Sequence, residues 1–321
     1  MPNVAPPIFT IRPRVLTSRP GHALASFVAM TKLASIALLS CLVSGVAVAE
    51  TKLTTTVYTA TPNGFLVTST LIAGEKEAIL IDAQFTLADA HRVVGQILDS
   101  KKTLTSVYVT HGHPDHYFGL EVIKQAFPKV KIVALDKPLA EIKKTAAAKV
   151  KQWGPVYGAQ ITAKPLTPAA QKAATLTLEG QTIELRGPTQ GDSGDSTYVW
   201  IPSTKTVIAG DIVFAGVHVW TAETNAEQRK AWIKTLDEIA ALAPTTVVPG
   251  HQDPKAKNDL SAVKATKDYL IAFDAAVASS KSADEAEQKM KAKYKDLQLD
   301  VILHFGAGAQ FAPPSPPPAK K

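Results

Sequence analysis

Three histidines and one aspartate stand within six consecutive positions, directly after an apolar run. The segment reads Thr110-His111-Gly112-His113-Pro114-Asp115-His116, and the run before it ends Ser106-Val107-Tyr108-Val109. In an extended loop, side chains two positions apart point the same way, so His111 and His113 can bind one ion together. Asp115 and His116 then project toward a second position. Because imidazole nitrogens and carboxylate oxygens suit zinc-like ions, the sequence predicts a metal-binding loop at the end of a strand.

Three further segments share one form, an apolar run that ends in an acidic residue or a histidine. They read Ala78-Ile79-Leu80-Ile81-Asp82, Val207-Ile208-Ala209-Gly210-Asp211 and Val247-Val248-Pro249-Gly250-His251. In this order, together with the His-x-His-x-Asp-His loop, they resemble the metallo-β-lactamase superfamily from about Leu53 to Leu270. The resemblance implies the α/β class and a four-layer αβ/βα sandwich. It leaves the substrate open, because this superfamily hosts many activities.

The resemblance also implies a set of ligands for one or two Zn2+ ions per chain. His111 and His113 would bind the first ion, and Asp211 would lie between the two ions. The ligands of the second ion would be Asp115, His116 and His251. A dication held in this way lowers the pKa of its bound water from about 15.7 to about 7, and the hydroxide attacks an electrophilic carbon. Asp115 is expected to be catalytic because its carboxylate can orient that hydroxide, and Asp82 is expected to brace the loop by hydrogen bonds.

The chain departs from the superfamily at one position. The superfamily normally supplies a third histidine to the first ion from a Gly-His-Ser/Thr turn, whereas the corresponding turn here reads Gly191-Asp192-Ser193. Asp192 is therefore predicted to be a substitute ligand that makes the first site more anionic. Two alternatives remain open. Either the first ion is weakly bound or absent, so that the enzyme works with one ion, or Asp192 only forms a turn.

These features predict a zinc-dependent hydrolase of a small electrophilic substrate, a cyclic amide or ester such as a β-lactam or a lactone. Asp192 weakens the β-lactamase interpretation specifically, because lactamases that resemble this fold generally keep their first metal site. One alternative is a hydrolytic dehalogenase of the same fold that works with one zinc ion. Another is a non-catalytic metal-binding member, which is disfavoured by the joint retention of Asp115, His116, Asp211 and His251.

Three residues are candidates for a substrate pocket. His218 and Trp220 follow Asp211 in the segment Gly216-Val217-His218-Val219-Trp220, where members of the superfamily often place groups that contact substrate. Tyr117 directly follows the metal loop. Each has an equally simple alternative as a core residue, since aromatic side chains and satisfied histidines are common in protein interiors.

An apolar stretch from Leu33 to Ala49 follows Lys32 and ends Ala47-Val48-Ala49 before Glu50. This pattern predicts a signal peptide over residues 1–49, cleaved between Ala49 and Glu50. Met30 is the expected initiator, with residues 1–29 an over-extended start. A membrane anchor and a lipoprotein attached at Cys41 are the alternatives. We expect a periplasmic or secreted protein whose mature chain is not stably inserted in a membrane and, without Cys41, has no thiolate ligand.

The mature chain is predicted to form one hydrolase domain over residues 50–305, in which helices pack on sheets because strand and helix patterns alternate. Residues 65–72 are expected to form an early strand, and Asn225 to begin a helix that reaches Leu242. A disordered tail is expected over residues 306–321, which contain Pro313-Pro314-Ser315-Pro316-Pro317-Pro318.

The net charge of +7 arises mainly in the leader, which has four basic residues and no acidic one. The remaining 31 basic and 28 acidic residues leave a charge of +3. No basic run is interleaved with aromatic residues, so we expect a small-molecule substrate and no nucleic-acid partner. The sequence leaves the oligomeric state open.

Overall fold

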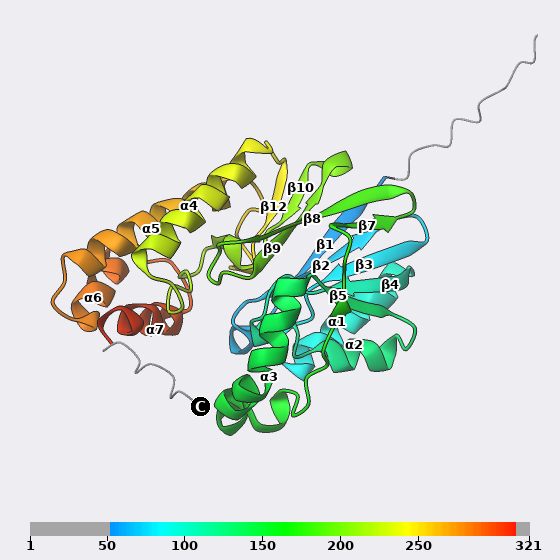
Figure 1. Cartoon of the computed structure of the whole chain (residues 1–321), viewed down its shortest axis with the longest axis horizontal. Coiled ribbons are helices and arrows are strands. Elements are labelled where there is room, and N and C mark those ends of the chain that lie inside the picture. The colour runs from blue at the N-terminus through cyan, green and yellow to red at the C-terminus, as the bar shows by residue number, and fades with distance from the viewer. Residues whose placement is uncertain (1–51, 313–321) are drawn as a thin grey trace, which may run out of the picture. The chain divides into compact units, whose positions relative to one another are not determined.

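The computed structural model describes residues 52–312, so the predicted signal peptide and the proline-rich residues 313–318 lie outside the described range. Within that range, two sheets pack face to face, and helices cover the outer face of each (Figure 1). Among residues 52–312, no helix has both the length and the apolar character that crossing a bilayer requires.

The first sheet has six strands in the order of the chain: β1 (Thr54–Thr59), β2 (Thr68–Ala73), β3 (Glu77–Ile81), β4 (Thr103–Tyr108), β5 (Lys131–Ala134) and β6 (Ala169–Ala170). The strands pair antiparallel up to β3 and parallel from β3 to β6. Parallel neighbours need a crossover, and helices make each one. These helices are α1 (Leu87–Ser100), α2 (Leu120–Ala126) and α3 (Asp136–Tyr157).

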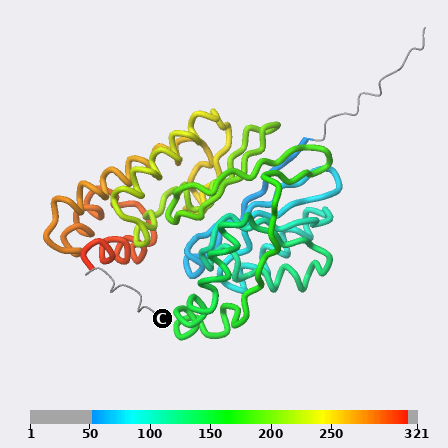
Figure 2. Tube along the Cα trace, in the orientation of Figure 1, coloured from blue at the N-terminus to red at the C-terminus, as the bar shows by residue number. Residues whose placement is uncertain are grey.

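The second sheet has five strands in the order β12-β10-β9-β8-β7. Their bounds are β7 (Thr175–Leu178), β8 (Gln181–Thr189), β9 (Ser196–Ile201), β10 (Thr206–Ile208) and β12 (Thr246–Val248). Two short strands that follow β10 and β12 in the chain, β11 (Phe214–Ala215) and β13 (His251–Gln252), form a separate parallel pair. The helices of this half are α4 (Ala226–Ala241), α5 (Ser261–Ala278), α6 (Ala283–Lys293) and α7 (Asp300–Phe311), coloured from yellow to red in Figure 2.

Three apolar cores show that the architecture has four layers. The central core joins the two sheets, for example Ile79 of β3 with Val199 of β9. A second core packs Val107 of β4 against α1 to α3, and a third packs Trp232 of α4 and Phe273 of α5 on the second sheet. Strands covered on both faces need apolar residues at successive positions, which explains the continuous apolar run of β3. The predicted αβ/βα sandwich of the α/β class is confirmed.

Local caps fix where two helices begin. Asn225 accepts a hydrogen bond from the backbone N of Gln228, whose side chain accepts one from the backbone N of Asn225, as expected for this N-cap. Ser282 caps α6 through Glu285 N. The predicted strand over residues 65–72 begins too early, because Phe65 has a left-handed φ of 59° that no strand accommodates.

The predicted start of a disordered tail at residue 306 is wrong, because α7 continues to Phe311. Gly306 lies against Thr221, and a Cβ atom at Gly306 would stand 2.5 Å from Thr221 Oγ1. Gln310 Nε2 donates to the carbonyl oxygens of Thr221 and Thr224, at 3.3 Å each. The absence of a side chain at Gly306 is therefore what lets the last helix dock closely.

Candidate metal centre

The predicted ligands come from four chain segments that meet near the ends of strands. His111 and His113 lie in the loop after β4, and Asp115 and His116 lie in the short helix η2 (Pro114–His116). Asp192 lies between β8 and β9, Asp211 lies in η5 (Gly210–Ile212) after β10, and His251 begins β13. The two sheets are joined beside this point, since Thr197 N and Oγ1 both donate to Thr110 O.

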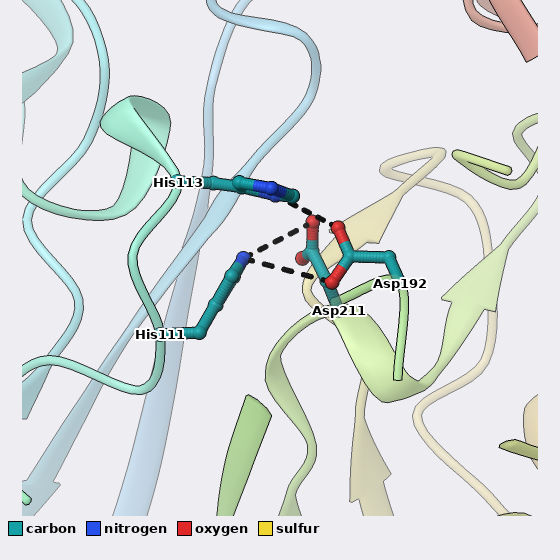
Figure 3. A group of neighbouring side chains, drawn as sticks. All are labelled: His111, His113, Asp192 and Asp211. Atoms are coloured by element: carbon teal, nitrogen blue, oxygen red, sulfur yellow. Dashed lines mark ion pairs between the residues drawn. The ribbon is translucent and has the colours of Figure 1, made fainter. Parts of the chain in front are cut away.

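The first group of side chains comprises His111, His113, Asp192 and Asp211 (Figure 3). The two histidines approach from one loop and the two carboxylates face them from the other half of the domain. His113 Nδ1 lies 2.8 Å from Asp192 Oδ2, and His111 Nε2 lies 3.9 Å from Asp192 Oδ1. The carboxylate of Asp192 thus lies opposite both histidines.

The second group comprises Asp115, His116 and His251. His251 Nε2 lies 3.2 Å from Asp115 Oδ2 and 3.2 Å from Asp211 Oδ2. His116 Nε2 lies 3.1 Å from Asp211 Oδ1. Asp211 Oδ2 also lies 3.7 Å from His111 Nε2, so the carboxylate of Asp211 is close to histidines of both groups.

Each histidine of the second group is held by its outward nitrogen. His116 Nδ1 lies 2.7 Å from Asp82 Oδ2, and His251 Nδ1 lies 2.6 Å from the carbonyl oxygen of Phe65. Asp82 also accepts hydrogen bonds from Thr110 N and Oγ1, at 2.8 Å each. Such outer partners fix the ring and its tautomer and leave the inner nitrogen free to bind a metal. Asp82 therefore braces the loop in the way that was predicted.

The histidines of the first group are held in the same manner. His111 Nδ1 lies 3.1 Å from Thr110 Oγ1, and His113 Nε2 lies 3.2 Å from Glu223 Oε2. Glu223 also forms an ion pair with Lys149, with 3.2 Å between Oε1 and Nζ. Glu223 was not identified from the sequence, because it is 110 positions from His113 and belongs to no motif.

Four buried atoms of the two groups lack a hydrogen-bond partner among the described residues: His111 Nε2, His116 Nε2, Asp192 Oδ2 and Asp211 Oδ1. The approach of His113 Nδ1 to Asp192 Oδ2 is short but is not aligned as a hydrogen bond. Buried polar atoms without partners are costly and therefore rare. One or two divalent ions would satisfy all four at once, and mixed histidine and carboxylate ligands suit zinc. The residues present fit a metal.

Burial and charge perturb the proton equilibria of these groups strongly. Burial alone would raise the pKa of Asp211, but His251 and His116 hold it well below its usual range. Burial raises the pKa of Asp192 despite the neighbouring His113. Burial would lower the pKa of His251, yet Asp211 and Asp115 raise it to about 10. A histidine that keeps its proton must lose it when a metal binds, so metal uptake and proton release are coupled here.

Comparisons with known proteins give this site its family. A sequence profile described as the metallo-beta-lactamase superfamily matches residues 62–251, which is more than half of the chain. The chain belongs to the metallo-β-lactamase superfamily. This membership supports its assignment as a metallo-hydrolase. A search of curated proteins finds no relative that matches it.

Two solved structures share the fold of this superfamily member. The crystal structure of DIM-1 metallo-beta-lactamase is 20% identical, with a TM-score of 0.50, and the match covers 68% of this chain and 92% of that one. The metallo-beta-lactamase family protein TTHA1429 from Thermus thermophilus is 17% identical, with a TM-score of 0.58, and the match covers 80% and 91%. At these identities the likeness concerns the fold alone.

A cavity of about 160 Å³ opens directly above the metal groups of this metallo-hydrolase. Its floor is formed by His113, Asp115, Asp211 and His251. Trp220 is among the residues that line its walls.

Two predicted pocket residues do not line that cavity. His218 is 1% exposed and its Nδ1 lies 3.0 Å from the hydroxyl of Tyr269, so it is a satisfied core histidine. Burial lowers the pKa of His218 below its ordinary value. Tyr117 is fully buried in the core between the first sheet and its helices. Both residues therefore have the alternative role that the sequence left open.

Proposed function

We propose that this metallo-hydrolase binds about two zinc ions and hydrolyses a small cyclic ester or amide. The observation that carries the proposal is the position of Asp211. Its carboxylate belongs to the first group of ligand atoms and also lies 3.1 Å from His116 Nε2 and 3.2 Å from His251 Nε2 of the second group. Four buried atoms of the two groups have no hydrogen-bond partner among the described residues. In this proposal Asp192 replaces a histidine as a ligand of the first ion, and the first ion is therefore held by two carboxylates and two histidines.

When bound, zinc would lower the pKa of a water molecule toward neutrality and polarise the substrate carbonyl. Asp115 is the carboxylate suited to orient that water, because it lines the cavity floor and its side chain is 13% exposed. Burial would raise the pKa of Asp115, but His116 and His251 hold it below its usual range. Asp115 is thus ionised at neutral pH, and it acts as a hydrogen-bond acceptor more readily than as a strong base.

Metal analysis of three proteins tests the number of ions. Wild type should carry about two zinc ions per chain, Asp192→Ala about one, and Asp192→His about two again, because imidazole restores a ligand. One ion in all three proteins would contradict the role given to Asp192. It would favour the hydrolytic dehalogenase that works with one metal, which halide release from an activated aromatic would detect.

Kinetics test the reaction. The zinc-loaded protein should hydrolyse at least one member of a panel of lactams, lactones, thioesters and aryl esters, and Asp115→Ala should remove that activity while thermal stability in excess zinc is kept. Failure across the whole panel would overturn the proposal.

We further propose that the protein is exported and that its mature chain begins at Glu50. The proposal rests on the apolar stretch that ends at Ala49. The N-terminal peptide of protein purified from the periplasmic fraction, identified by mass spectrometry, should begin at Glu50. A first residue upstream of Leu33 would contradict cleavage, and a lipid on Cys41 would establish the lipoprotein instead.

A further inference from the structure

The walls of the cavity above the metal groups are mainly apolar. Trp153 of α3 and three residues of α7 line the cavity, and Figure 1 shows that these two helices belong to different halves of the domain. The apolar side chains of the walls are Phe65, Trp153, Trp220, Val301, Ile302 and Phe305. The three residues of α7 lie beyond residues 62–251, which the superfamily profile matches. The superfamily profile therefore does not describe this part of the wall.

Two residues of this wall are unusually open for large apolar side chains. Val301 is 45% exposed and Phe305 is 50% exposed. The ring of Phe305 meets the ring of Trp220 edge to face, with 6.3 Å between centroids. Apolar side chains gathered over a polar floor are typical of a ligand site, whereas exposed apolar residues scattered singly need no explanation.

The helix that carries the wall is held firmly. Gly306 packs against Thr221, as described above, and Arg229 Nη1 donates to Gln310 Oε1 at 3.1 Å. Arg229 is 1% exposed and also donates to Asp274 Oδ1 at 2.6 Å. The wall is thus in place before a ligand arrives, so little ordering cost opposes binding.

The charges of the cavity outside the metal groups cancel. Among the described lining residues, the charged side chains beyond the predicted ligands are Lys149 and Glu223. They form an ion pair with 3.2 Å between Nζ and Oε1. A carboxylate on the substrate would have to displace Glu223 to reach Lys149. The cavity therefore suits an uncharged apolar group better than an anionic one.

We propose that the space between α3 and α7 binds the apolar substituent of an uncharged lactone or ester, and that Phe305 determines this specificity. The inference rests on the proposed hydrolase function and names its substrate class. The rings of Trp153, Trp220 and Phe305 in the walls suit an aromatic or similarly apolar group. The substituent is thus an aryl group, or an alkyl group of similar size.

The test uses zinc-loaded protein and three γ-butyrolactones that carry hydrogen, phenyl or carboxylate at the same ring carbon. The reacting bond is shared, so kcat/KM should rise about tenfold from hydrogen to phenyl and should fall for carboxylate. Phe305→Ala should lower the ratio of kcat/KM for the phenyl and unsubstituted lactones about tenfold. Ile271→Ala is the matched control, because Ile271 is 51% exposed on α5 and does not line the cavity. It should leave the ratio unchanged.

Binding of the same lactones, followed by tryptophan fluorescence, separates this inference from the proposed function. In one outcome the protein turns over none of the three lactones and still binds the phenyl lactone selectively, with Phe305→Ala abolishing that selectivity. This result would refute lactone hydrolysis and support the apolar subsite. Turnover or binding with no preference for phenyl over carboxylate would overturn the subsite. Equal loss of preference in Phe305→Ala and Ile271→Ala would also overturn it, because the effect would not be local.

Discussion

Replacing Asp82 by Asn tests whether one buried carboxylate holds the metal loop in place. Asp82 is 3% exposed, and it accepts hydrogen bonds from Thr110 N through Oδ1 and from Thr110 Oγ1 and His116 Nδ1 through Oδ2. Asn is the informative replacement because it has the same shape. It also tolerates the left-handed φ of 60° that Asp82 adopts, so the backbone is not strained further.

The amide of Asn keeps only one acceptor oxygen. If that oxygen still accepts from Thr110 N, the NH2 group of Asn faces His116 Nδ1. His116 Nδ1 then has to accept a hydrogen bond, whereas in the wild type it donates one. His116 Nε2 would carry the proton, and a protonated nitrogen is not a metal ligand. Loss of a hydrogen bond to a charged group costs about 1.5–3 kcal/mol. Loss of an outer partner lowers metal affinity about 10–100-fold, which is about 1.4–2.7 kcal/mol.

Urea unfolding with a chelator should therefore show a loss of about 1.5–3 kcal/mol in Asp82→Asn, and unfolding in saturating zinc should show a further loss of about 1.4–2.7 kcal/mol. Competition with a chromophoric chelator measures the zinc affinity directly. The control is Asp89→Asn, since Asp89 is 1% exposed and accepts from Tyr58 Oη and Thr86 Oγ1 at 2.7 Å each. Asp89 has no contact with the metal groups, so its variant should lose stability equally with and without zinc. An unchanged zinc affinity in Asp82→Asn would refute the reasoning.

Three other perturbations follow from the geometry. Gly250→Ala would place a Cβ atom on Asp211 Oδ1. The substitution should therefore lower the free energy of unfolding by about 1–3 kcal/mol and reduce the zinc content measured by elemental analysis. Full zinc content would contradict the role of Asp211 as a ligand. Glu223→Gln should weaken the first zinc site about tenfold in chelator competition, because the negative charge that faces His113 Nε2 is lost. Equal affinity would show that the contact is incidental. His218 has a pKa held below its ordinary 6.5 by burial, so the unfolded chain takes up its proton first as the pH falls. The unfolding free energy of the metal-free protein should thus decrease below about pH 6.5, and His218→Gln should flatten that decrease.

Most of the ligands were predictable from the sequence because they follow an apolar strand, whereas Asp192 precedes one. An apolar run followed by His or Asp indicates both where a strand ends and which polar side chain lies at that end, as for Asp211 and His251. Asp192 was found because its turn, Gly191-Asp192-Ser193, corresponds to the Gly-His-Ser/Thr turn of the superfamily and precedes β9. Glu223 had no such signal, because its contact with His113 depends on how the segment before α4 folds back over the metal loop.

The direction of a side chain was less predictable than its position. His218 and Trp220 are two positions apart, and in a regular strand both would point the same way. The segment is not regular, since His218 N donates to the carbonyl oxygen of Gln298, and Val217 pairs with Gln298 as an isolated bridge. His218 consequently points into the core beside Tyr269, whereas Trp220 lines the cavity.

The contrast between the metal groups and α7 explains why the reaction class can be read from this sequence and the substrate class requires the structure. Metal ligands recur at fixed distances from strand ends, so local pattern is enough to find them. The wall at Phe305 depends on a helix whose glycine at position 306 looks like a break in the pattern but is required for close contact with Thr221. That helix also lies outside residues 62–251. Substrate preference in this chain therefore has to be argued from its C-terminal helix, which the superfamily profile does not describe.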